Sequence, residues 1–219
     1  MLTIDHGQVA LARDGERRLD LTLRLECGDV ALLVGPNGSG KTTLLDVVAG
    51  VRPLSAGTLV RRHPDQPVAY AVQDSASGLL PWRTVAENIL FPARLNDAAD
   101  DGLVARSQDL LKSLRLAGRM HDFPYKLSGG EKQAVNLIRA ICTPCSLALI
   151  DEILTSLHHD LRSIAKQVLT EWLEERTAIV VTHDPDDLDL PFTRFFAING
   201  GCLEEVDRGR AEKVLGNHV

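Results

Sequence analysis

The chain has 219 residues, of which 44% are apolar and 25% are charged, as in an ordinary globular domain. Its formal net charge of -6 gives no electrostatic reason to expect DNA or RNA, so we expect no nucleic-acid partner. The longest apolar runs are only about five or six residues, far below the roughly 20 of a membrane-spanning helix. Because the first predicted strand begins at residue 2, we expect no leader segment. We therefore expect a cytosolic protein that reaches a membrane only through a partner.

The N-terminal part of the chain predicts an antiparallel pair of strands. LDLTLRL, at residues 19–25, alternates apolar and polar side chains strictly, which is typical of a half-buried strand. We expect it to pair antiparallel with residues 2–4 and 9–12.

Three further segments are continuously apolar and predict strands buried on both faces, as in a parallel sheet. They are VALLV at 30–34, SLALI at 146–150 and AIVVT at 178–182. A more polar, mostly helical segment lies between residues 73 and 127, and FFAINGGCLEEV predicts a hairpin that turns at 199–201. The sequence therefore predicts an α/β fold with a mostly parallel core sheet, an antiparallel β flank and a helical insert.

GPNGSGKT, at residues 35–42, fits the phosphate-loop pattern G-x-x-x-x-G-K-[ST] between a predicted strand and a predicted helix. Its glycines permit the φ angles that turn backbone N–H groups onto phosphate oxygens, and the helix N-terminus adds a partial positive charge. Lys41 is predicted to contact the β- and γ-phosphates, and Thr42 to offer its hydroxyl to Mg²⁺. The structural alternative is a glycine-rich turn with a capping threonine. The predicted nucleotide-binding residues are Gly35, Pro36, Asn37, Gly38, Ser39, Gly40, Lys41, Thr42 and Thr43.

Two adjacent acids end the predicted strand at 146–150. In P-loop proteins a second strand carries an aspartate that holds Mg²⁺, which suits Asp151. Glu152 is then placed to orient or deprotonate an attacking water. The structural alternative is a pair of solvated acids at the end of a strand.

LSGGEKQ, at residues 127–133, supports both a structural and a functional interpretation. Ser128 and Glu131 form the S-x-x-E capping box of a helix start. The same helix N-terminus, with Gly129 and Gly130 at its head, is also an anion-binding site that is poor in side chains. Because one nucleotide does not need two such sites from one chain, we expect this one to serve a nucleotide held by a second copy.

Four motifs occur in a fixed order: GPNGSGKTT, LSGGEKQ, ALIDE and VVTHD. Together they resemble the ATPase subunit of ATP-binding cassette (ABC) transporters, over nearly the whole chain from residue 2 to residue 206. LSGGE is the most specific of them, because few other P-loop families carry it. The resemblance implies a single P-loop ATPase domain over residues 1–219, with a helical subdomain at 75–143 inserted in the catalytic core. It also implies ATP and Mg²⁺ as ligands.

The resemblance also implies roles for individual residues in a head-to-tail dimer that sandwiches two ATP molecules. Gln73 matches a glutamine that touches Mg²⁺ or water and relays to the membrane subunit, and His183 matches a histidine that contacts the γ-phosphate. The alternative for His183 is a histidine at a strand end near a capping Asp184. The implied catalytic residues are Glu152, His183 and Gln73; the implied metal ligands are Thr42, Gln73 and Asp151; and the implied contacts to the partner's nucleotide are Ser128, Gly129, Gly130 and Glu131.

The sequence departs from the family pattern in three places. Ile153 stands where a proline is usual, and Thr155-Ser156-Leu157-His158 stands where the family has S-A-L-D, so His158 replaces an aspartate of the subunit interface. Histidine changes charge between about pH 5 and 8, so we expect slow, pH-sensitive hydrolysis, unless His158 is simply an exposed loop residue. No aromatic residue precedes Tyr70 to stack on adenine. The cationic or planar side chains that could stack instead are His6, Arg13, Arg17 and Arg18.

GLLPWRTVAENI, at residues 78–89, is similar to a stretch in importer ATPases for nitrate, sulfonates, taurine and pyrimidine vitamin precursors. This similarity favours an ATPase subunit that powers a separate permease and imports a small solute or anion. Trp82 in this stretch is expected at the membrane partner, unless it is a core aromatic. Exporter-type ATPases carry related sequences, so the direction of transport stays open.

The expected partners are a second copy or a paired ABC subunit, an integral membrane permease and, for an importer, a solute-binding protein. The expected location is the cytoplasmic face of the cell membrane, as a peripheral subunit. Two other classes compete with this interpretation: a nucleotide-binding regulator with weak hydrolysis, and a soluble ABC protein of DNA repair or translation. The second class carries tandem cassettes or a long coiled coil, and residues 73–127 hold neither.

Overall fold

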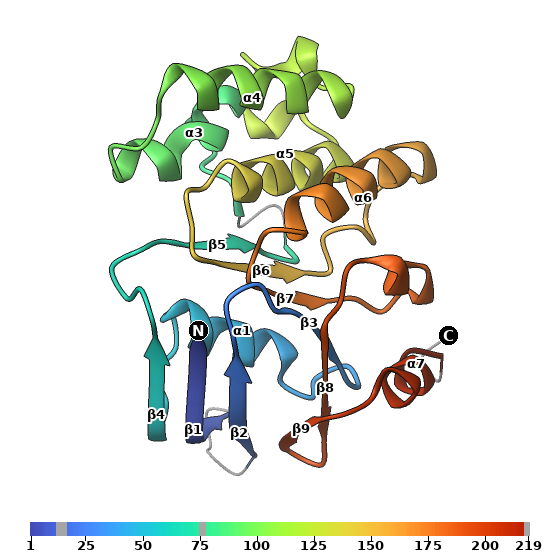
Figure 1. The fold of residues 1–219 in the computed structure, drawn as a ribbon. Coiled ribbons are helices and arrows are strands. Elements are labelled where there is room, and N and C mark those ends of the chain that lie inside the picture. The colour runs from blue at the N-terminus through green and yellow to red at the C-terminus, as the bar shows by residue number, and fades with distance from the viewer. Residues whose placement is uncertain (12–16, 75–77, 217–219) are drawn as a thin grey trace. The chain divides into compact units, whose positions relative to one another are not determined.

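A computed structural model describes residues 1–11, 17–74 and 78–216 of the chain (Figure 1). The chain divides into two compact units, which we call unit 1 (Met1–Asp65 with Leu173–Val219) and unit 2 (Gln66–Trp172). Each unit is described by itself below.

Unit 1 contains a mixed sheet with a buried parallel part and an antiparallel flank. Its strands are β1 (Leu2–Ala10), β2 (Arg18–Leu25), β3 (Val30–Val34), β4 (Ala56–Arg61), β7 (Ala178–Val181), β8 (Arg194–Asn199) and β9 (Cys202–Glu205), and its helical segments are α1 (Lys41–Ala49), η3 (Pro185–Asp189) and α7 (Arg208–Gly216). β3 runs parallel to both β7 and β8, and all its residues are buried, as its continuously apolar sequence predicts. β1 pairs antiparallel with β2 and β4. The predicted parallel core and antiparallel flank are therefore confirmed.

The two N-terminal segments predicted to pair with β2 are one continuous strand, β1. Leu2 lies opposite Leu25 and Val9 opposite Leu19, with an irregular register between Ile4 and Gly7. The bulge lets one long strand continue past a local kink, which the alternation pattern alone did not reveal. The strand ends at Ala10, and residue 12, the end of the predicted segment, lies outside the described residues.

The predicted hairpin is β8–β9. Asn199 lies opposite Cys202, so Gly200 and Gly201 form a two-residue turn. Both glycines have positive φ, 56° and 83°, the backbone conformation that a tight hairpin of this kind requires. Helix α7 lies beside β8 (Figure 1). Its buried Ala211 and Leu215 belong to a core cluster with Leu32, Val34 and Ala197.

Unit 2 joins two parallel strands to a group of helices (Figure 1). Its elements are β5 (Val68–Ala71), β6 (Leu147–Asp151), α3 (Val85–Leu95), α4 (Asp101–Ser113), η1 (Ala117–Arg119), η2 (Pro124–Lys126), α5 (Gly129–Ile141) and α6 (His159–Leu173). α5 packs against β5 and against α3 and α4. The helices α3, α4 and α5 fall within the interval 75–143 that we predicted as a helical subdomain, and the boundaries of that subdomain stay a prediction.

Helices α3 and α5 each start with a capping box. Thr84 and Glu87 cap α3, and Ser128 and Glu131 cap α5, with both reciprocal bonds present in each case. The capping box therefore fixes where α5 begins, as the LSGGE sequence predicts. In the described part of the chain, no helix is both long enough and apolar enough to cross a membrane.

Candidate nucleotide-binding and catalytic site

The predicted phosphate loop connects β3 to α1 in unit 1, and its backbone depends on glycine at two points. Gly35 has φ 152°, and a Cβ there would lie 2.8 Å from the carbonyl oxygen of Ile198. Gly40 has φ 111°, and a Cβ there would lie 2.7 Å from Leu11 and 2.9 Å from Leu19. A side chain at either position would collide with the sheet, so the loop keeps its shape only with these glycines.

Lys41 lies at the first position of α1 and folds back over the loop. Its ammonium nitrogen donates to the carbonyl oxygens of Gly35, at 2.8 Å, and Pro36, at 3.1 Å, and the residue is only 6% exposed. These contacts hold the cation at the loop. Thr42, beside it, is exposed.

The N-terminus of α1 has the features of an anion site. Its N-cap, Gly40, makes no side-chain capping bond, and the first turn contains no acidic residue. The partial positive charge at this end of the helix dipole therefore favours a negative ligand. The hydroxyl oxygen of Ser39 is buried and has no hydrogen-bond partner among the residues that the structure describes.

Of the four side chains considered for stacking on adenine, Arg17 contacts the loop. Its guanidinium donates to the carbonyl oxygen of Gly38 at 3.3 Å. His6 lies at the bulge of β1 and Arg18 at the start of β2, and both are exposed. Arg13 lies outside the described residues. The stacking role stays a prediction, for which Arg17 is now the preferred residue.

His183 follows β7 in a tightly bonded turn. The hydroxyl of Thr182 donates to the buried carboxylate of Asp187 at 2.6 Å and accepts from the backbone N–H of Asp184 at 3.1 Å. Asp184 caps η3 by accepting from the N–H of Asp186 at 2.9 Å. These bonds fix the backbone on either side of His183, which is half-buried. Its predicted contact with a γ-phosphate stays a prediction.

Unit 2 brings together two of the predicted catalytic residues. The side-chain amide of Gln73, just after β5, donates to a carboxylate oxygen of Glu152 at 2.8 Å. Asp151 ends β6 and is only 1% exposed, whereas Glu152 is half-buried. The hydroxyl of Thr155 donates to the carbonyl oxygen of Glu152 at 2.7 Å and holds the turn that follows the strand.

The departures from the family pattern have different structural settings. Ile153, at the usual proline position, is buried in the core at 1% exposure. His158 is exposed just before α6. Both interpretations of His158, as an altered interface residue and as a plain surface residue, therefore stay predictions.

The LSGGE segment presents an exposed helix start in unit 2. A carboxylate oxygen of Glu131 accepts from the N–H of Ser128 at 2.8 Å, and the Ser128 hydroxyl accepts from the N–H of Glu131 at 3.2 Å. The second carboxylate oxygen of Glu131 accepts from Arg119 at 3.2 Å. The bond from Ser128, with help from Arg119, holds the pKa of Glu131 below its usual range. Ser128 and Gly129 are exposed, so an anion can reach this helix start.

Trp82 is not a core residue. It is 70% exposed, so the core alternative is wrong. The turn that carries it is held by Asn88, which is fully buried and accepts from the N–H of Leu80 at 2.7 Å. The amide nitrogen of Asn88 donates at 3.0 Å to the carbonyl oxygens of Leu80, Arg83 and Thr84. A rigid turn therefore displays an exposed indole ring.

Sequence reasoning missed three polar side chains of α5, Gln133, Asn136 and Arg139, that bind the segment containing Gln73. Their spacing of three residues on an otherwise apolar helix face was a signal that could have found them.

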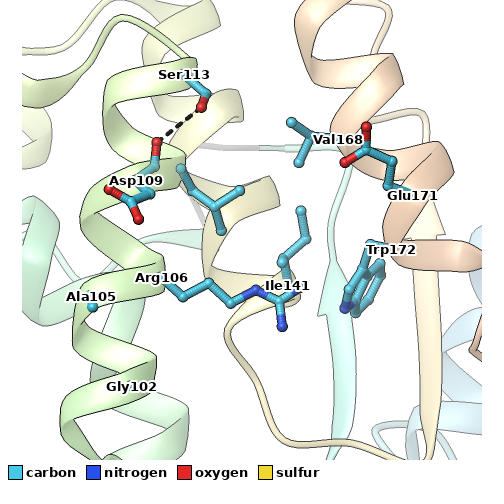
Figure 2. Close-up of a pocket in the computed structure, with 10 residues that line it drawn as sticks. Gly102, Ala105, Arg106, Asp109, Ser113, Ile141, Val168, Glu171 and Trp172 are labelled. Carbon is cyan, nitrogen blue, oxygen red and sulfur yellow. Dashed lines mark hydrogen bonds between the residues drawn. The ribbon is translucent and has the colours of Figure 1, made fainter.

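A separate hollow of about 510 Å³ lies in unit 2 between α4, the end of α5 and α6 (Figure 2). In Figure 2, the side chain of Arg106 extends from α4 toward Ile141 and Trp172. None of the predicted site residues lines this hollow.

The comparison with known proteins establishes the family. Residues 19–155 match the profile of the ABC transporter family, and the chain belongs to that family. It is 37% identical over 204 residues to the aliphatic sulfonates import ATP-binding protein SsuB of Burkholderia thailandensis, covering 87% of this chain and 57% of that protein. It is 30% identical over 194 residues to the taurine import ATP-binding protein TauB of Shigella dysenteriae serotype 1, covering 86% of this chain and 76% of that protein. The family resemblance inferred from the four motifs is confirmed.

The fold is also found among solved structures. An ATP-binding cassette solved as a dimer in a post-hydrolysis state with ADP and phosphate matches with a TM-score of 0.80 and 21% identity. The match covers 94% of this chain and 99% of that one, so the fold is that of an ABC cassette. The chain spans about half the length of several curated relatives that it matches.

Proposed function

We propose that this chain is the ATP-hydrolysing subunit of an ABC importer and powers a separate membrane permease for a small solute or anion. The phosphate loop is the observation that carries this proposal, because its glycines are sterically required and its lysine is already held in place. The family membership and the import functions named for relatives of sulfonate and taurine type support it.

In the proposed mechanism, the phosphate loop and the N-terminus of α1 bind the phosphates of ATP. Lys41 contributes a charge-assisted contact to the terminal phosphates, replacing its bonds to the loop carbonyls. His183 is proposed to donate to the γ-phosphate. Arg17 is proposed to lie along the adenine, in place of the aromatic ring that the family uses.

The residues assigned to Mg²⁺ supply oxygen donors, which suit this hard cation: the hydroxyl of Thr42, the amide oxygen of Gln73 and the carboxylate of Asp151. Such a small protein donor set fits Mg²⁺, which keeps several waters and is bound through one or two carboxylates together with substrate phosphates. When bound, the ion neutralises charge on the phosphate oxygens.

Glu152 is proposed to orient and deprotonate the attacking water. Gln73 already donates to its carboxylate, which fixes the orientation of that carboxylate through a single hydrogen bond. The in-line displacement then depends on positioning and electrostatics more than on covalent chemistry.

The exposed start of α5 is proposed to serve a nucleotide held by a second copy. Ser128, Gly129 and Gly130 offer an anion site with few side chains, and Glu131 completes the cap behind them. The similar cassette that was solved as a dimer supports a dimeric state. We propose that the pair sits on the cytoplasmic face of a membrane permease, with a solute-binding protein on the opposite side.

The test is a Glu152→Gln variant, which keeps the shape of the side chain and removes its charge. We expect it to bind Mg-ATP and to stop hydrolysing it, so that ATP holds two copies together. Size-exclusion chromatography with ATP should show a stable dimer that the natural protein forms only briefly. A variant that retains full ATPase activity would refute the proposed role of Glu152.

Copurification from native membranes would identify the permease. A cassette subunit should carry an integral membrane protein with it after mild solubilisation. Recovery of the chain alone, together with only weak ATPase activity in solution, would favour the regulator instead of the transport subunit.

A further inference from the structure

Helix α5 carries a row of polar side chains on a face that is otherwise apolar. Gln133, Asn136 and Arg139 are spaced by three residues, so they lie along one side of the helix. Gln133 is 1% exposed and Asn136 is fully buried, and burial lowers the pKa of Arg139. Because buried polar groups cost free energy unless they are hydrogen-bonded, their partners indicate what the row does.

The first two side chains bind the main chain that leaves β5. The amide nitrogen of Gln133 donates to the carbonyl oxygen of Gln73 at 3.3 Å. The amide nitrogen of Asn136 donates to the carbonyl oxygen of Val72 at 3.0 Å. Two successive peptide groups are therefore held from α5, 60 or more residues further along the chain.

Arg139 connects the same row to Gly78. Its guanidinium donates through one nitrogen to the side-chain oxygen of Asn136, at 2.8 Å, and through the other to the carbonyl oxygen of Gly78. A Cβ on Gly78 would lie 3.0 Å from Val72 and 3.4 Å from the amide of Asn136. Val72 and Gly78 are therefore packed close together, and the side chain of Asn136, which comes from α5, lies beside both.

Gln73 is consequently held at two points. Its carbonyl oxygen accepts from Gln133, and its side-chain amide donates to Glu152 at 2.8 Å. If its main chain were released, the side chain could pair with Glu152 only by losing more conformational freedom, which lowers the fraction of molecules with the pair formed.

Gln133 is a poor choice for packing alone. Its side-chain oxygen is buried without a hydrogen-bond partner among the described residues, which costs free energy. A methionine fills a similar volume without that cost. The amide is therefore better explained by its donation to Gln73.

We propose that Gln133 and Asn136, braced by Arg139, are positioning residues that fix Gln73 against Glu152. The inference rests on the proposed ATPase function and adds that the catalytic carboxylate is oriented from the helix that begins with LSGGE. One helix, α5, would thus present the proposed anion site at its N-terminus and orient Glu152 through Gln73.

The test compares the steady-state ATPase kinetics of the natural protein with those of the Gln133→Met variant. We expect kcat to fall roughly tenfold to a hundredfold, as for a catalytic group displaced from its working geometry. KM and the affinity for Mg-ATP measured by calorimetry should stay unchanged. The urea concentration at the midpoint of unfolding should stay unchanged or rise. Asn136→Leu, which removes the bond to Val72, should act in the same direction and serves if Gln133→Met does not fold.

Two further comparisons separate positioning from a general structural effect. In a Gln73→Ala background, Gln133→Met should cause no additional loss of kcat, because the group it positions is gone. Thr143→Val removes another buried hydroxyl just after α5, which donates to the backbone carbonyl oxygen of Arg139 at 2.8 Å and leaves the side chains of the row in place, so kcat should stay unchanged.

An unchanged kcat in Gln133→Met would overturn the inference. An equal loss in both backgrounds would also overturn it, because the effect would not pass through Gln73. A natural protein without any ATPase activity would instead refute the proposed function, so the two failures are distinguishable.

Discussion

Glu152 has a backbone φ of 50°, in the left-handed region that residues with a Cβ rarely adopt. The conformation turns the chain sharply after β6 and presents the carboxylate to the amide of Gln73. Backbone strain of this kind costs about 1 to 3 kcal/mol and tends to occur at functional sites. At the scale of the residue, the proposed catalytic group is therefore kept in spite of its cost to stability.

This strain predicts the effect of Glu152→Asn. Asparagine tolerates the left-handed region better, so the variant should be as stable as the natural protein or more stable, by up to about 1 kcal/mol. It should have lost ATP hydrolysis, because the shorter amide cannot act as a base. Urea unfolding and a steady-state ATPase assay measure the two effects. A clear loss of stability would show that the carboxylate is required by the fold.

Lys41 leads to a second prediction at the same scale. Its ammonium group bonds two loop carbonyls in the structure and is proposed to bind phosphate when ATP enters. Lys41→Ala removes this ammonium donor and its charge-assisted contact with phosphate, so the affinity for Mg-ATP should fall at least about tenfold, the equivalent of roughly 1.4 kcal/mol. Isothermal calorimetry is the measurement. Thr43→Ser, which keeps a hydroxyl on the same turn, is the control, and equal loss in both would point to damage of the loop.

At the scale of the element, the start of α5 combines a helix cap with a charged pair. Glu131 bonds the N–H of Ser128 with one carboxylate oxygen and Arg119 with the other. Its side chain is 25% exposed and that of Arg119 is 44% exposed, so water weakens the ion pair more than the cap. The cap is therefore the larger contribution, and an ionised carboxylate at residue 131 accepts a stronger bond there than a neutral amide oxygen would.

The lowered pKa of Glu131 gives this element a pH dependence. A carboxylate whose folded pKa is lower stabilises the fold above its unfolded pKa of about 4.3, and this contribution is lost as the pH falls through the folded pKa. Glu131→Gln should therefore be less stable than the natural protein at pH 7 by about 0.5 to 1 kcal/mol. The difference should shrink below about pH 4.

Urea unfolding of both proteins at pH 7 and at about pH 3.5 tests this dependence. Glu174→Gln, at an exposed position after α6, should show no comparable difference at either pH. A difference between Glu131→Gln and the natural protein that grows toward acid would contradict the assignment.

At the scale of the whole molecule, the exposed Trp82 is the residue that we propose to contact the membrane partner. Trp82 is 70% exposed on a turn that Asn88 holds with four hydrogen bonds. Tryptophan is enriched at protein interfaces, where its ring supplies a large apolar contact area and its N–H a polar handle. We infer that a membrane partner covers it in the assembled transporter.

Trp82→Ala should therefore leave the isolated chain folded, with an unfolding free energy within about 0.5 kcal/mol of the natural value. ATP binding by the isolated chain should also persist. ATP-driven transport in reconstituted vesicles should fall strongly, because the aromatic anchor of the interface is lost. Full transport by the variant would remove Trp82 from the interface.

The sequence alone determined the parts of this protein whose chemistry is local. The phosphate loop, the capping box of LSGGE, the buried parallel strands and the Gly200–Gly201 hairpin each depend on neighbouring residues, so their patterns are legible along the chain. The family followed from four such motifs and their order.

Only the tertiary structure decided which distant residues meet. Gln73 and Glu152 are 79 positions apart, and no local pattern states that they share a hydrogen bond. Likewise, helical spacing could mark Gln133 as unusual but could not name Gln73 as its partner, and composition could not tell an exposed Trp82 from a buried one. The reason is physical: a local pattern fixes backbone conformation and the buried face of an element, whereas packing between elements selects the partner on that face.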